Sequence, residues 1–163
     1  NAITDKTPEL IEACKVSLLD RGFGQKSGAN GSGWGKANKV NLWARAKDGN
    51  RAYSMLRELI NKNIAPNLWD FHPPYQMDGN CGYTSGVCEM LCYSSDEIIE
   101  LLPALPEEWK NGSVKGLCAR GGYSLDFTWE NGEIKSLSVY SSCGKKTARI
   151  KTGDEIKTVK TVG

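Results

Sequence analysis

The segment Asn67–Asn80 gathers the residue types that could bind or cleave a sugar. It reads NLWDFHPPYQMDGN and contains two carboxylates, Asp70 and Asp78, together with the only histidine of the chain, His72. The double proline stiffens the backbone in an extended form, and Gly79 permits a sharp turn beside Asp78. A stiff loop of this kind holds polar side chains in fixed directions, and binding or catalytic residues are often found on such loops.

Glycoside hydrolysis is a chemistry that these side chains fit. Carboxylates, amides and imidazole can bind sugar hydroxyls, and the rings of Trp69 and Tyr75 can lie against the apolar C–H face of a sugar. Cleavage needs two carboxyl groups, one that protonates the leaving oxygen and one that attacks or activates water. Asp70 and Asp78 are the carboxylates of this loop, with His72 as a hydrogen-bonding partner. The same residues are also compatible with turn and helix capping around a buried histidine, so residue types alone leave both interpretations open.

Other kinds of site lack their sequence patterns. There is no Gly-x-Ser-x-Gly elbow of a serine hydrolase, and the glycine-rich stretch 22–35, in which Gly31–Gly33 is interpreted as a flexible turn, lacks the context of a phosphate-binding loop. Another hypothesis is a metal site built from His72, Cys81, Cys88 and Cys92. The cysteine spacing is unlike that of structural zinc sites, so we expect no metal and no cofactor, with Cys88 and Cys92 as small buried hydrophobic residues.

The composition excludes several classes of protein. Of the 163 residues, 39% are hydrophobic and 25% are charged, and the net charge is +2, which is typical of globular domains. No apolar run approaches the roughly 18 to 20 residues that a membrane helix needs. Basic residues are not concentrated in one patch, as they are in most nucleic-acid-binding proteins. We therefore expect neither a membrane span nor a nucleic-acid partner.

The first half of the chain has the periodicity of helices. Apolar residues recur every three or four positions, and Thr7-Pro8 is a typical helix start. Asp48-Gly49 is expected to end the second helix. The predicted helices run from residue 7 to about 22, from about 36 to 47, from about 50 to 61 and from about 82 to 93.

The second half alternates between apolar and other residues, as β-strands do. Such runs occupy 114–118, 123–129 and 134–139, after a short apolar run at 98–102, and Asn131-Gly132 is a strong hairpin signal. Helices followed by strands predict an α+β fold. We expect helical hairpins in residues 1–95 and an antiparallel β-sheet or sandwich in residues 96–163.

The Asn67–Asn80 segment resembles the signature of glycoside hydrolase family 95, the α-L-fucosidases that act on α-1,2-linked fucose. The matching string is Asp70-x-His72-Pro73-Pro74-Tyr75-Gln76-x-Asp78-Gly79-Asn80-x-Gly82. Further stretches resemble the family in the same order: Gly33-Trp34, Asn41–Arg45, Gly86-x-x-Glu89-Met90-Leu91, Leu101–Pro106 and Gly112–Gly122.

The resemblance implies that residues 1–95 are the last helices of a catalytic (α/α)6 barrel, with the active-site loop at 67–80. Residues 96–163 would be the β module behind it. Asp78 matches the aspartate that activates the attacking water in an inverting mechanism, and His72 matches a histidine that contacts the terminal sugar. Trp69, Tyr75 and Asn80 are expected to line the cleft as neighbours of these residues.

The resemblance also implies that part of the catalytic machinery lies upstream. The family's general acid is a glutamate on an earlier barrel helix, so the expected partners are a fucosylated oligosaccharide and the upstream part of the same enzyme. The chain alone is therefore expected to be inactive. A bacterial source and an extracellular or periplasmic location are further expectations, and the alternative function is a non-catalytic carbohydrate-binding or scaffolding module.

Overall fold

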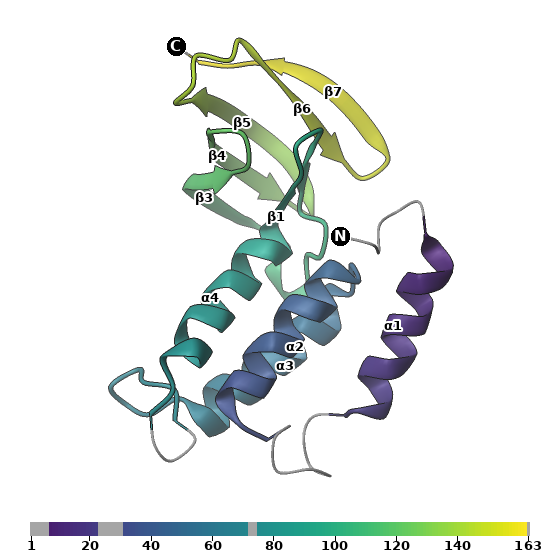
Figure 1. Ribbon diagram of the computed structural model, residues 1–163. Helices are drawn as coiled ribbons and strands as arrows, with labels where there is room; N and C mark the ends of the chain where they lie inside the picture. The colour runs from purple at the N-terminus through teal and green to yellow at the C-terminus, as the bar shows by residue number, and fades with distance from the viewer. Residues whose placement is uncertain (1–6, 23–30, 72–74, 163) are drawn as a thin grey trace.

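The computed structural model describes residues 7–22, 31–71 and 75–162, in which four α-helices precede seven strands and a short 3-10 helix (Glu107–Trp109) lies between the second and third strands (Figure 1). The helices are α1 (Pro8–Asp20), α2 (Gly33–Arg45), α3 (Gly49–Asn63) and α4 (Met77–Leu91). The strands are β1 (Cys92–Ser94), β2 (Ile99–Leu101), β3 (Gly112–Ala119), β4 (Tyr123–Glu130), β5 (Glu133–Ser141), β6 (Thr147–Thr152) and β7 (Glu155–Lys160). The predicted α+β class is confirmed.

Side-chain caps define the starts of two helices. The Ser32 hydroxyl accepts a hydrogen bond from the Gly35 amide (3.2 Å) at the start of α2, and the Asp48 carboxylate accepts one from the Arg51 amide (3.0 Å) at the start of α3. Both caps satisfy amides that have no partner within the helix. The prediction that Gly31–Gly33 is only a flexible turn is therefore wrong, because Ser32 caps a helix there.

Helix α4 begins at Met77, whereas the sequence pattern placed its start near Gly82. Glycine disfavours helix by about 1 kcal/mol relative to alanine, but here it permits close packing. A Cβ at Gly82 would lie 2.9 Å from that of Ala37, and one at Gly86 would overlap the side chain of Val40. Contact with α2 thus outweighs the low helix propensity, and the last residues of the predicted loop form the first turn of α4.

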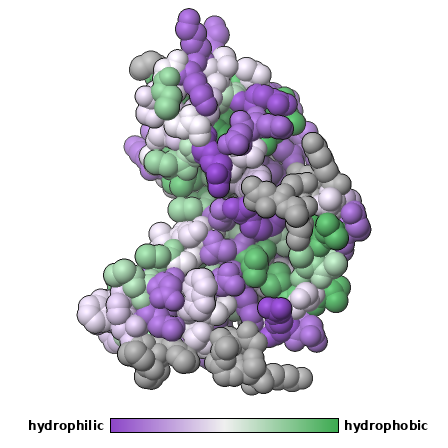
Figure 2. All heavy atoms as spheres, in the orientation of Figure 1, coloured by the Kyte–Doolittle hydropathy of each residue, from purple (hydrophilic) through white to green (hydrophobic). Residues whose placement is uncertain are grey.

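Helix α1 is the outermost helix and shows apolar side chains to solvent. Apolar surface gathers on the side of the molecule where α1 lies (Figure 2). Exposed apolar residues of this helix are Leu10, Val16 and Leu19. None of the helices in the described ranges is both long and apolar enough to cross a membrane.

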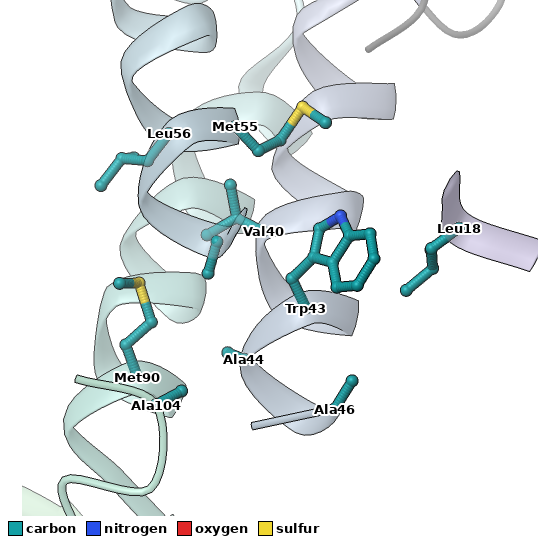
Figure 3. Packing of buried hydrophobic residues seen from close by; sticks show 10 residues of the cluster. Leu18, Val40, Trp43, Ala44, Ala46, Met55, Leu56, Met90 and Ala104 are labelled. Atoms are coloured by element: carbon teal, nitrogen blue, oxygen red, sulfur yellow. The ribbon is translucent and has the colours of Figure 1, made fainter. Parts of the chain in front are cut away.

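The core of the helical half lies between α2, α3 and α4. Val40 and Trp43 of α2 meet Met55 of α3 and Met90 of α4, and all four are almost fully buried. Leu18 of α1 points toward Trp43 from the side (Figure 3). Full burial of such a side chain is worth about 1.5–3 kcal/mol, so this cluster holds the three inner helices as one unit.

The strands form two sheets, in the orders β1-β2-β6-β7 and β3-β4-β5. All strand pairs are antiparallel except β2 with β6, which is parallel. The β module is therefore antiparallel as expected, apart from this one pair. Parallel strands need a long connection, and here the whole three-stranded sheet lies between β2 and β6 in the chain. The predicted hairpin is confirmed, since Asn131 and Gly132 both have positive φ (51° and 78°) between β4 and β5.

The two sheets share one hydrophobic core. Leu125, Phe127 and Val139 of one sheet and Ile99 and Ile150 of the other belong to the same cluster of buried residues. Alternation along the strands therefore places one face of each sheet inward, as in a β-sandwich.

The sheets are fixed to one end of the helices. Glu100 of β2 pairs with Lys47, just after α2 (2.9 Å), and with Lys151 of β6 (3.2 Å). The carbonyl oxygen of Trp109, between β2 and β3, accepts a hydrogen bond from the Trp129 indole N–H (2.8 Å), and the Trp109 ring lies against that of Tyr53 in α3 (5.7 Å between centroids). Helix α4 runs directly into β1, so the segment before Met77 lies at the end of α4 remote from the sheets (Figure 1).

Candidate active site

Asp78 is exposed and lies in the first turn of α4. The amide groups of a first helical turn carry partial positive charge, which favours a carboxylate there. Its position at the free end of the helical half leaves Asp78 accessible to water and to a ligand. A proton acceptor for an attacking water needs this access.

Trp69 and Tyr75 form an aromatic pair next to this helix start. Their ring centroids are 4.8 Å apart at an interplanar angle of 38°, and their side chains are 55% and 39% exposed. Leu68, Phe71 and Met77 in the same region are exposed as well. Clustered exposed apolar groups indicate a surface that meets a ligand or another part of a protein.

Asn80 holds the loop through both polar atoms of its side chain. Its oxygen accepts a hydrogen bond from the Asp70 amide (2.8 Å), and its nitrogen donates to the carbonyl oxygen of Leu68 (2.8 Å). The structure therefore assigns Asn80 to loop positioning. Contact between Asn80 and a sugar stays a prediction.

Asp70 differs from Asp78 because it is 0% exposed. Its carboxylate lies against Gly33, at the start of α2, and Gly79, in the first turn of α4, so closely that a Cβ on either glycine would overlap it. Sequence patterns left both carboxylates open to a direct catalytic role. The structure places Asp70 where a substrate cannot reach it.

Buried polar groups continue from Asp70 between α2 and α3. The Lys36 ammonium group donates to the Asn63 side-chain oxygen (2.8 Å) and lies 3.7 Å from a carboxylate oxygen of Glu58. Asn63 in turn donates to the carbonyl oxygen of Gly31 (3.2 Å). Burial lowers the pKa of Lys36, while the negative charges of Glu58 and Asp70 act in the opposite direction. The sequence patterns did not predict this cluster. The one signal in the sequence is Lys36, a lysine on a helix face that packs inward.

His72 lies outside the described residues, and so does its predicted contact with the sugar. In the ranges that the structure describes, no three His, Cys, Asp or Glu side chains come together to hold a metal ion. All six cysteines are free thiols. Cys92 is buried as predicted, whereas the prediction for Cys88 is wrong, because the Cys88 side chain is exposed.

A cavity in the helical half lies away from Asp78. It has a volume of about 600 Å³ and is bounded by α1, the second half of α2, the end of α4 and the β1–β2 connection. Its lining includes Leu18, Leu42 and the ion pair between Arg45 and Glu89. Asp78 itself is exposed and is not among the residues that line this cavity.

Sequence models of known families cover nearly the whole chain. Residues 1–91 match the catalytic domain of glycosyl hydrolase family 95, and residues 93–162 match the C-terminal domain of the same family. The helices therefore fall in the first match and the strands in the second.

Curated relatives match over most of this chain. Alpha-L-fucosidase 2 of Arabidopsis thaliana is 34% identical over 149 residues, which cover 84% of this chain and 17% of the relative. Probable alpha-fucosidase A of Aspergillus oryzae is 35% identical over 136 residues, 73% of this chain and 18% of the relative. Probable alpha-fucosidase A of Aspergillus niger is 31% identical over 158 residues, which cover 87% of this chain and 20% of the relative.

The chain thus spans no more than a fifth of the length of these relatives. A plant and two fungi are their sources, so they give no support to the expected bacterial origin.

Proposed function

Because the chain belongs to glycosyl hydrolase family 95, we propose that it forms one wall of the catalytic cleft in a larger enzyme that releases α-1,2-linked L-fucose from glycans. The names of the relatives support fucose as the sugar. The observation that carries the proposal is the exposed Asp78 carboxylate in the first turn of α4, beside the exposed pair of Trp69 and Tyr75.

Asp78 is the general base of an inverting reaction in this proposal. Its carboxylate takes a proton from a water molecule as the water oxygen forms a bond to the anomeric carbon of fucose. The bond from that carbon to the glycosidic oxygen breaks on the opposite face, and the leaving oxygen receives a proton from a carboxylic acid on an upstream helix. An inverting enzyme separates the two carboxyl groups by about 6.5–9.5 Å to admit this water, and the open surface around Asp78 leaves room for it.

The rest of the loop binds and orients the sugar. The tilted aromatic pair of Trp69 and Tyr75 offers apolar ring surface for the C–H face of the sugar, and His72 donates to or accepts from its hydroxyl groups. Asn80 keeps the loop in place through its two backbone contacts. Each of these roles requires the other walls of the cleft, which the upstream part of the enzyme supplies.

The chain alone is inactive under this proposal. One positioned acid or base contributes about 10²–10⁴-fold in rate, and the acid belongs to the upstream part of the enzyme. Exposed apolar side chains of the loop, among them Leu68, Phe71 and Met77, form the surface that this upstream part covers.

The test uses the whole enzyme, with the upstream sequence joined to this chain. Incubated with a 2′-fucosylated oligosaccharide and an α-1,3-fucosylated one of equal size, it should release fucose from the first much faster. Proton NMR during the first minutes should show the β-anomer of L-fucose before mutarotation. Absence of fucose release, or an α-anomer formed first, would contradict the proposal.

The second candidate is a non-catalytic carbohydrate-binding or scaffolding module, which the exposed aromatic pair would also suit. Titration calorimetry of the isolated chain distinguishes the two. Binding of fucosylated oligosaccharide by the isolated chain, combined with no hydrolysis by the joined protein, would favour this candidate.

A further inference from the structure

We propose that Asp70 is a positioning residue for the reaction: its buried carboxylate fixes the first turn of α4 and thereby sets the place of Asp78 in the cleft. The inference rests on the proposed role of Asp78. It assigns different tasks to two carboxylates of one loop, of which one is exposed and one is 0% exposed.

The carboxylate of Asp70 is wedged between the starts of two helices. On one side it meets Gly33, the first residue of α2, and on the other it meets Gly79 of α4, and neither position has space for a Cβ. Gly79 directly follows Asp78 in the chain. A shift of the Asp70 carboxylate toward Gly79 therefore displaces the peptide unit beside the proposed base.

The backbone of Asp70 is held by the same elements. Its amide donates to the Asn80 side chain (2.8 Å), and its carbonyl oxygen accepts from the amide of Gln76 (3.1 Å), the residue that precedes α4. The backbone of Asp70 also forms an isolated antiparallel β-bridge with Ile64, which directly follows α3. The residue thus connects the end of α3 with the starts of α2 and α4.

Groups that can compensate a negative charge lie around the Asp70 side chain. Burial of a charge costs free energy unless compensating groups surround it. Here the first turns of α2 and α4 supply the partial positive charge of helix N-termini, and the buried ammonium group of Lys36 interacts with the charge of Asp70.

Asp70 acts only through its neighbours. Its complete burial separates it from any substrate, so its loss should affect the alignment of Asp78 more than the affinity for sugar. A misplacement of a reacting group by 1 Å can cost about 10²-fold in rate. A partial relaxation of the first turn of α4 should cost less than that.

The experiment compares three variants of the whole enzyme at a temperature where circular dichroism shows each to be folded. Asp70→Asn keeps the size of the side chain and removes its charge, and we expect kcat to fall about 10- to 100-fold with KM within about two-fold of wild type. Val139→Ala is the control, because Val139 is buried in the β module far from the loop. It should destabilise the protein and leave kcat unchanged. Asp78→Asn reports separately on the proposed base.

The outcomes separate the two proposals. Wild-type kcat in Asp70→Asn, with Asp78→Asn inactive, would overturn the positioning role and leave the function standing. Full activity of Asp78→Asn would overturn the assignment of Asp78 as the base, and with it the positioning role of Asp70 that rests on it.

Gly79→Ala supplies a second test should Asp70→Asn fail to fold. It keeps the carboxylate and displaces it, so the same loss of kcat is expected. Unchanged kcat in Gly79→Ala would overturn the inference.

Discussion

Replacement of Glu100 by glutamine tests how the β module is attached to the helices. Glu100 is buried in β2, and its carboxylate faces two ammonium groups, that of Lys47 after α2 (2.9 Å) and that of Lys151 in β6 (3.2 Å). Glu100→Gln keeps the shape of the side chain and removes the charge that both lysines face.

The expected loss of stability follows from the burial of the three groups. Removal of one member of a fully buried ion pair costs about 3–5 kcal/mol. The lysine side chains retain some exposure, 32% for Lys47 and 17% for Lys151, and glutamine keeps one accepting oxygen. We therefore expect about 2–3 kcal/mol. For a chain of this length, 1 kcal/mol corresponds to about 2–4 °C, so Tm should fall by about 4–12 °C.

Thermal unfolding followed by circular dichroism measures this effect. Glu133→Gln is the matched control, because Glu133 pairs with Lys135 at 2.8 Å on the exposed surface of β5. The same chemical change there should leave Tm unaltered, since exposed ion pairs contribute little. Equal Tm values for Glu100→Gln and wild type, or an equal fall in both variants, would refute the argument.

Three further predictions concern packing and protonation. Gly86→Ala should lower the free energy of unfolding, measured by urea denaturation, by about 1–2 kcal/mol, because its methyl group would overlap the side chain of Val40. The cost of this overpacking exceeds the gain in helix propensity, and an increase in stability would contradict the close contact of α2 and α4. Burial raises the pKa of Cys92 to about 12, so at pH 8 iodoacetamide should spare Cys92 in the folded chain and modify it in urea, while the exposed cysteines react in both conditions. Burial lowers the pKa of Lys36 below its ordinary value of 10.5, so the folded chain loses this proton before the unfolded chain does. The unfolding free energy of wild type relative to Lys36→Met should then rise as the pH increases toward that value, and a constant difference would contradict the burial.

Local sequence patterns predicted the class and order of the elements. Apolar periodicity identified the four helices, and Asn131-Gly132 identified the hairpin between β4 and β5, because each signal arises within a few neighbouring residues. The start of α4 was missed since its glycines oppose helix formation locally. Only the contacts of Gly82 and Gly86 with α2 explain why the helix begins at Met77.

Long-range pairings could not be predicted from the sequence. The parallel pairing of β2 with β6 joins Ile99 to Ile150, and no local pattern encodes a partner so far along the chain. The same holds for the carboxylates of the loop. Asp70 and Asp78 lie on the same short loop, and only the packing of Asp70 against Gly33 and Gly79 shows which of them is buried.

Helix α4 presents a carboxylate at its free end, the loop before it presents aromatic rings, and the β module holds the opposite end of the helices. The proposal places the acid of the reaction on upstream helices, so catalysis requires both parts to meet across one cleft.

The most direct test of the proposed base is the turnover of the whole enzyme with Asp78→Asn on a 2′-fucosylated oligosaccharide. Asparagine preserves the size of the exposed side chain, so the circular dichroism spectrum and Tm should match those of wild type. We predict a fall in kcat of at least about 10²–10⁴-fold, the contribution of a positioned acid or base, with KM nearly unchanged. A variant that releases fucose at the wild-type rate would contradict the assignment of Asp78.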